Sequence, residues 1–180
     1  MSIVKGLIEK MGGSIEVESE EGVGSTFIIK IPFKIASTPY KVNKQTSEIK
    51  IDGLNLLLVE DNELNVEIAE TLLSDEGAVV TVAKDGLQAV NIFKEKPEGS
   101  FDAILMDIMM PVMDGLTATK KIRTLNHPDA KKIPIIAMTA NAFVEDMRKT
   151  KEAGMNEHLT KPVDGEKLLQ VLYKYKKTGL

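Results

Sequence analysis

The sequence predicts an α/β domain with a doubly wound, five-stranded parallel sheet, because short apolar runs alternate with helical patterns over most of its 180 residues. Five runs carry the strand pattern: 55–59, 79–83, 103–106, 135–139 and 157–160. Each is followed by a helical segment, and right-handed crossovers between parallel strands place helices on both faces of the sheet. We therefore expect five helices and a sheet that is covered on both sides.

The helical period is clearest in two of these segments. Apolar residues recur every four positions from Leu64 to Leu72, and a second stripe runs from Leu168 to Tyr175. Both stripes indicate amphipathic helices.

Composition excludes several classes of function. Lys and Arg total 23 against 27 Asp and Glu, so the net charge of −4 disfavours direct nucleic-acid binding. With no cysteine, the chain offers neither disulfides nor a thiolate metal site. It has no apolar stretch long enough to span a bilayer, which predicts no direct membrane insertion and a cytoplasmic location.

The first 34 residues carry a different pattern. Apolar residues between positions 3 and 11 fall on one helical face, and two alternating segments around residues 14–19 and 25–31 predict a β-hairpin. A helix and a hairpin of this size cannot bury a core alone. We expect residues 1–34 to be an appendage, 35–53 a polar linker and 54–176 the main domain.

Polar side chains follow four of the predicted strands. Glu60 and Asp61 follow the first strand, Asp107 the third, Thr139 ends the fourth and Lys161 follows the fifth. Ligands of doubly wound sheets bind beyond the carboxyl ends of the strands, where these side chains should meet. Three carboxylates together predict a hard divalent ion, and Mg²⁺ suits such a sparse set of oxygen ligands.

These residues stand in motifs that resemble those of response-regulator receiver domains. The motifs are LVEDN at 58–62, LMDIMMPVMDG at 105–115, MTA at 138–140 and KP at 161–162. The resemblance implies a flavodoxin-like fold with strand order 2-1-3-4-5. It also implies a phosphoryl-accepting function in two-component phosphorelay signalling, with a phosphohistidine-bearing kinase or phosphotransfer protein as partner, and it is compatible with a homodimer.

The resemblance assigns roles to the acidic and catalytic residues. Asp107 is the implied acceptor of the phosphoryl group, and Lys161 and Thr139 bind its oxygens. Asp61, Asp107 and the backbone carbonyl of Met109 are the implied Mg²⁺ ligands, and Glu60 assists through water.

The family's switch couples the threonine at Thr139 to an aromatic residue three positions before the lysine. This chain has His158 there, in place of tyrosine or phenylalanine. We assign His158 to the switch and to no catalytic role, and we assign the four methionines at 106, 109, 110 and 113 to packing.

A second resemblance covers residues 2–33. SIVK at 2–5, GG at 12–13, IEV at 15–17 and GVGSTF at 22–27 are similar to the end of a histidine-kinase ATP-binding domain. Only that last portion matches, so ATP binding is not expected. The implied parent is a hybrid histidine kinase whose kinase core is incomplete here, and the receiver itself would be a phosphoacceptor, not a turnover enzyme.

Two other functions compete with this interpretation. An Asp-nucleophile, Mg²⁺-dependent phosphatase of the haloacid-dehalogenase type would need a second aspartate two residues after Asp107, where the chain has Met109. A receiver-like interaction module that is not phosphorylated would not need Asp61, Asp107, Thr139 and Lys161 together.

Overall fold

The computed structural model describes residues 2–34, 50–140 and 144–177. The chain divides into two compact units, Met1–Gln45 and Thr46–Leu180.

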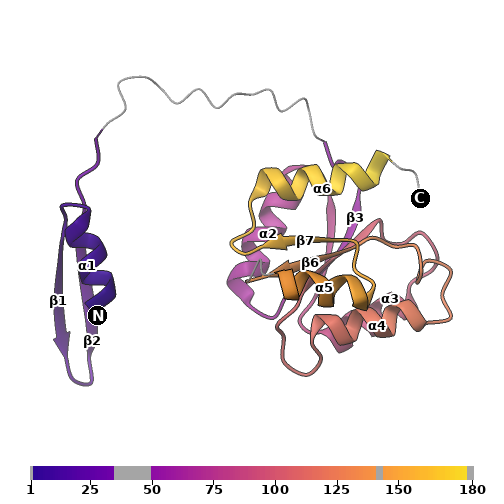
Figure 1. Cartoon of the computed structure of the whole chain (residues 1–180), viewed down its shortest axis with the longest axis horizontal. Coiled ribbons are helices and arrows are strands. Elements are labelled where there is room, and N and C mark those ends of the chain that lie inside the picture. The colour runs from indigo at the N-terminus through magenta and orange to yellow at the C-terminus, as the bar shows by residue number, and fades with distance from the viewer. Residues whose placement is uncertain (1, 35–49, 141–143, 178–180) are drawn as a thin grey trace. The chain divides into compact units, whose positions relative to one another are not determined.

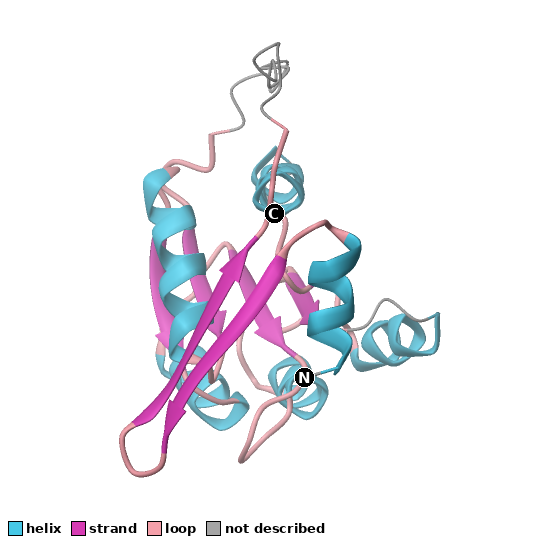
Figure 2. Ribbon diagram, turned by 90° about the vertical axis from the view of Figure 1, so that its left-hand side faces the viewer, coloured by secondary structure: helices cyan, strands magenta, loops and turns pink. Residues whose placement is uncertain are grey.

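The smaller unit is a helix beside a hairpin, as the sequence predicts. It contains α1 (Ser2–Lys10), β1 (Ser14–Glu20) and β2 (Gly24–Lys30). Figure 2 shows the two strands as an antiparallel ribbon closed by a short turn, with Ile15 opposite Ile29. Ile8 is buried, whereas Phe27 and Ile29 are at least half exposed. The unit therefore buries little apolar surface of its own.

The larger unit alternates strands and helices throughout. Its elements are β3 (Asn55–Val59), α2 (Glu63–Asp75), β4 (Val79–Ala83), α3 (Gly86–Glu95), β5 (Ala103–Asp107), α4 (Gly115–Thr124), β6 (Ile135–Thr139), α5 (Val144–Ala153), β7 (Glu157–Thr160) and α6 (Gly165–Lys177). The sheet order is β4-β3-β5-β6-β7, and every pairing in it is parallel. This confirms the predicted doubly wound fold, its strand order 2-1-3-4-5 and its five helices. Within the described ranges, no helix is both long and apolar enough to cross a membrane.

The central strands are buried on both faces because successive side chains of a strand point to opposite sides. Leu56 and Leu58 of β3 lie in one apolar cluster with residues of α2 and α6, such as Leu73 and Leu172. Leu57 of β3 lies in the other cluster, with residues of α3 and α4. Figure 1 shows the sheet between these helical layers. The result is a sheet covered on both faces, in which the carboxyl ends of all five strands lie at one edge.

The apolar stripe that identified α2 in the sequence is largely exposed. Leu64 is 63% and Ile68 60% exposed, whereas Leu73 is fully buried and Ala69 packs against the core. Two residues of the stripe are therefore available for contact with another molecule. In α6, by contrast, the stripe faces the core, since Leu168 and Leu172 are buried in the same apolar cluster as Leu73.

The end of the predicted linker packs on the larger unit. Residues 35–49 lie outside the described residues, but Ile51 is fully buried in the cluster that α2 and α6 cover. Lys176 of α6 also donates a hydrogen bond to the backbone carbonyl of Asp52 at 2.6 Å. Residues 50–53 therefore form part of the folded unit that follows them.

Candidate functional site

The parallel strands bring the predicted acidic and catalytic residues to one edge of the sheet. Glu60 and Asp61 follow β3, Asp107 ends β5, and Thr139 ends β6. Lys161 follows β7, and its N–H donates to the carbonyl of Thr139 at 2.7 Å. The edge therefore holds these side chains on the ends of buried elements, as the sequence predicts.

Lys161 joins two buried carboxylates at this edge. Its Nζ atom lies 2.5 Å from Oε2 of Glu60 and 2.6 Å from Oδ2 of Asp107. Glu60 is only 2% and Asp107 5% exposed. Charge-assisted hydrogen bonds of this kind hold the two carboxylates in place. Both have already lost their hydration through burial, and breaking the contact with Lys161 would leave that loss uncompensated.

The backbone around Asp107 holds its carboxyl group in place. Oδ1 of Asp107 accepts a hydrogen bond from the N–H of Met109 at 3.1 Å. Gly115, the first residue of α4, lies so close that a Cβ there would be 2.0 Å from the Asp107 carbonyl oxygen. Asp114 caps α4 by accepting hydrogen bonds from the N–H and hydroxyl of Thr117. The start of α4 is thus built against the end of β5, and only glycine fits at that contact.

The protonation equilibria of the pair reflect burial and mutual attraction. Burial raises the pKa of the Asp107 carboxyl above its ordinary value, and hydrogen bonds from Lys161 and the Met109 N–H offset this only in part. Burial lowers the pKa of Lys161, but its hydrogen bonds to Asp107 and Glu60 outweigh burial and raise that pKa overall. The site therefore favours a cation beside Asp107 and resists a bare carboxylate there.

Three carboxylates at the edge can offer oxygens to a single metal ion. One oxygen each from Glu60, Asp61 and Asp107 lies within 4.8 Å of the others. Asp61 is exposed, so it can meet an ion that arrives from solvent. An all-oxygen set with few carboxylates fits Mg²⁺, which keeps several of its waters. The donor chemistry therefore suits the predicted ion.

Met109 corrects one prediction about the methionines. Its side chain is 78% exposed, so it does not pack in the core, whereas Met106 and Met110 are buried. A predicted ligand role for Met109 uses only its backbone carbonyl and does not depend on where this side chain points.

The sequence did not reveal how Glu60 is held. Nδ2 of Asn65, on the first turn of α2, donates to Oε1 of Glu60 at 2.9 Å. Asn62 begins the same helix, because its Oδ1 accepts from the N–H groups of Leu64 and Asn65. An acidic residue followed five positions later by asparagine, across a helix cap, is the signal that could have predicted this contact.

His158 lies on the same face of the sheet as Thr139. It pairs in register with Ala137, and residues two apart on a strand point to the same side. Its side chain is partly buried, as the sequence predicts for a strand residue here. The switch role of Thr139 and His158 stays a prediction.

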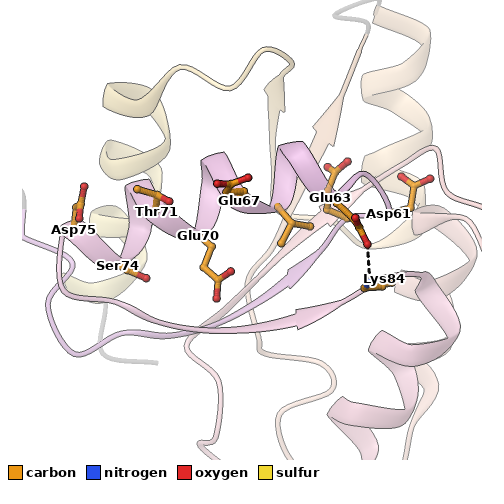
Figure 3. Close-up of a pocket in the computed structure, with 10 residues that line it drawn as sticks. Asp61, Glu63, Glu67, Glu70, Thr71, Ser74, Asp75 and Lys84 are labelled. Atoms are coloured by element: carbon orange, nitrogen blue, oxygen red, sulfur yellow. Dashed lines mark hydrogen bonds and ion pairs between the residues drawn. The ribbon is translucent and has the colours of Figure 1, made fainter.

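Two depressions flank α2 beside the site. A groove of about 540 Å³ runs from Asp61 along the helix and is lined by carboxylates, including Glu67 and Glu70. Figure 3 shows these side chains along the helix and the ion pair of Glu63 with Lys84. On another face of α2, a smaller, mainly apolar cleft is lined by residues of α2, by Lys161 and by Pro162, Val163 and Leu168.

Comparison with known proteins identifies the same region. Residues 56–173 match the response regulator receiver domain family. The chain is 34% identical over 175 residues to the aerobic respiration control sensor protein ArcB of Escherichia coli (strain K12), an alignment that covers 97% of this chain. The chain spans only 22% of the length of that sensor protein.

Solved structures agree with this match. One is the receiver domain of the sensor histidine kinase PA1611 from Pseudomonas aeruginosa PAO1, with a magnesium ion coordinated in its active-site cleft. It is 41% identical, with a TM-score of 0.62 over 68% of this chain and 97% of that one. Another is the Saccharomyces cerevisiae Ssk1 receiver domain in complex with the histidine phosphotransfer protein Ypd1. It is 33% identical, with a TM-score of 0.60 over 69% of this chain and 89% of that one.

Proposed function

The chain belongs to the response regulator receiver domain family, and we propose that Asp107 is the residue of this receiver that accepts a phosphoryl group in a two-component phosphorelay. One observation carries the proposal. Asp107 ends the central strand β5 with both carboxyl oxygens hydrogen-bonded, one of them by Lys161, a cation from the end of β7. A nucleophile held next to a cation is what transfer of an anionic group requires.

The reaction follows from these residues. A carboxylate oxygen of Asp107 attacks the phosphorus of a phosphohistidine, the new O–P bond forms, and the P–N bond to the imidazole breaks. Lys161 moves from the carboxylate to the phosphoryl oxygens, and the hydroxyl of Thr139 donates to another of them. The product is an acyl phosphate on Asp107.

A bound Mg²⁺ would neutralise charge on the transferring group. Asp61, Asp107 and the Met109 carbonyl would hold it, with Glu60 acting through water. The support is the donor set, three carboxylates with oxygens within 4.8 Å of one another, and the magnesium ion of the PA1611 receiver.

The partner we propose is a phosphohistidine protein that docks over α2. Leu64 and Ile68 are exposed there, and Ile68 also lines the apolar cleft that reaches Lys161. An exposed apolar patch of this kind at the edge of an active site is typical of a protein-binding surface. The complex of Ssk1 with Ypd1 supports a partner of the same class.

For the parent protein we propose a hybrid histidine kinase. In this arrangement residues 1–34 are the last part of the ATP-binding domain, 35–53 the linker, whose last four residues pack on the domain that follows, and 54–176 the receiver. The alignment with the ArcB sensor protein, which runs through the smaller unit as well as the receiver, supports it.

The proposal is tested with acetyl phosphate and Mg²⁺, followed by intact mass spectrometry. The parent should gain one phosphoryl group, and Asp107→Asn should gain none. Asp102→Asn is the matched control, because Asp102 lies just before the other end of β5, where its side chain accepts from the Asn55 N–H. Equal labelling of folded Asp107→Asn and parent would overturn the assignment, as would a parent that is never labelled.

A further inference from the structure

Glu60 is the acid at this edge whose two oxygens are both bound by protein side chains. Oε1 accepts from Nδ2 of Asn65 at 2.9 Å, and Oε2 accepts from Nζ of Lys161 at 2.5 Å. The two donors come from different elements, the first turn of α2 and the loop after β7. A carboxylate whose two oxygens both accept hydrogen bonds is restrained from rotating and from moving toward a nearby ion.

Asp61 and Asp107 differ from Glu60 in this respect. Asp61 is exposed, and Asp107 is held by the Met109 N–H and by Lys161, the same cation that Glu60 uses. When Lys161 turns to a phosphoryl group, Glu60 loses one of its two restraints. Lys161 is shared with Asp107 already in the resting site, so the hydrogen bond from Asn65 is the restraint that Glu60 does not share with Asp107.

We propose that Asn65 is a positioning residue that sets the metal selectivity of the site, by holding Glu60 out of direct coordination. The inference rests on the proposed function, because it presumes a cation at the acidic edge. Mg²⁺ takes six ligands in a tight octahedron and keeps waters, whereas Ca²⁺ takes six to eight oxygens at longer distances in flexible geometry. A third carboxylate that is free to close therefore favours Ca²⁺ over Mg²⁺.

The position of Asn65 makes the idea testable without damage to the core. Asn65 is exposed, and the rest of its helix is anchored by the Asn62 cap and by Leu73 in the core. Asn65→Leu keeps a side chain of similar size and removes the donor. Asn65→Asp keeps the shape, removes the donor and adds a charge that repels Glu60.

The experiment is calorimetric titration of the full chain with Mg²⁺ and separately with Ca²⁺, at constant ionic strength. We expect Asn65→Leu to lower the ratio of Mg²⁺ affinity to Ca²⁺ affinity by about tenfold, the lower end of what outer-shell partners of metal ligands contribute. Asn65→Asp should lower it at least as much. Thermal melts without metal check that both variants fold.

A double-mutant cycle separates this role from a structural one. If Asn65 acts through Glu60, then Asn65→Leu should not change the ratio further in a Glu60→Gln background. An unchanged ratio in Asn65→Leu, or an equal loss with and without Glu60, would overturn the inference and leave the phosphoryl site intact. A parent that binds neither ion would overturn both the inference and the proposed metal site.

Discussion

The ammonium group of Lys161 lies 2.6 Å from the Oδ2 atom of Asp107, the carboxylate that we propose as the acceptor. The same ammonium also binds Glu60. Lys161 therefore binds two buried acids with one positive charge, and in the proposed phosphotransfer it would leave one of them to bind a phosphoryl oxygen. The resting site is a closed ion cluster, and this arrangement leads to predictions about its stability.

Lys161→Met should destabilise the folded protein strongly near neutral pH. Removing one partner of a buried ion pair costs roughly 3 kcal/mol, because it leaves uncompensated charge on Glu60 and Asp107. Urea unfolding measures the loss. Lys174→Met is the control, since its ion pair with Glu157 is at the surface and should contribute much less to stability. Equal losses of stability in the two variants would contradict a special contribution of the buried Lys161 ion pairs to folding.

The stability of the parent relative to Asp107→Asn should depend on pH in one direction. The pKa of Asp107 is raised in the folded state, mainly by burial, so the folded protein holds this proton more tightly than the unfolded chain does. The resulting stability is fully present below the ordinary pKa of 3.8 and is lost as pH rises through the folded pKa. The free energy of unfolding of Asp107→Asn should therefore rise relative to that of the parent as pH rises across that window. Unfolding free energies of both proteins in metal-free buffers from pH 3 upward test this prediction. A stability of Asp107→Asn that falls relative to that of the parent as pH rises would contradict it.

Added Mg²⁺ should stabilise the parent more than it stabilises Asp107→Asn. An ion that binds only the folded state adds RT ln(1 + [Mg²⁺]/Kd), about 2.7 kcal/mol at a hundredfold excess over Kd. The measurement is a pair of thermal melts at constant ionic strength, which separates binding from screening. Glu67→Gln, a change in the neighbouring groove, should respond as the parent does. Equal responses of parent and Asp107→Asn would rule out Asp107 as a ligand.

The loop between Asp107 and α4 contains a strained backbone position. Val112 has φ 63°, a region that costs a β-branched residue free energy, and its side chain is 79% exposed. Val112→Gly should therefore raise the free energy of unfolding by about 1 kcal/mol. Val112→Ala, which keeps a Cβ, should raise the free energy of unfolding by less. Denaturant unfolding of the three proteins distinguishes strain at this residue from a general effect of its apolar side chain.

Much of this fold could be predicted because its elements are locally encoded. Each strand of the sheet is a short apolar run, and the polar residues that follow Val59 or end β5 and β6 fall where parallel strands must meet. The residues of the site could be found one by one for the same reason. The contact of Asn65 with Glu60 was missed, because the five-residue spacing that could have indicated it leads to a contact only where the Glu60 side chain points toward α2.

The periodicity of α2 misleads for a physical reason. A stripe from Leu64 to Leu72 indicates an amphipathic helix, but period alone does not tell which apolar residues face the core and which face a partner. Here Leu73 and Ala69 face the core, while Leu64 and Ile68 remain exposed. The exposed apolar residues of this helix are the ones that the proposed docking surface uses.

Ile68→Asp should separate a protein donor from a small-molecule donor. Ile68 is 60% exposed and lines the apolar cleft beside Lys161, so an acid there should disrupt docking of a phosphohistidine protein without altering Asp107. We expect phosphotransfer from a purified histidine phosphotransfer domain that reacts with the parent to fall at least about tenfold, the effect of losing roughly 1.4 kcal/mol of binding. The rate with acetyl phosphate, which needs no docking surface, should stay within about twofold. Leu87→Asp, a change at another exposed apolar residue at the start of α3 in the other helical layer, should leave both rates unchanged. Loss of both rates in Ile68→Asp would mean that the change damages the site itself, and loss of neither would remove α2 from the docking surface.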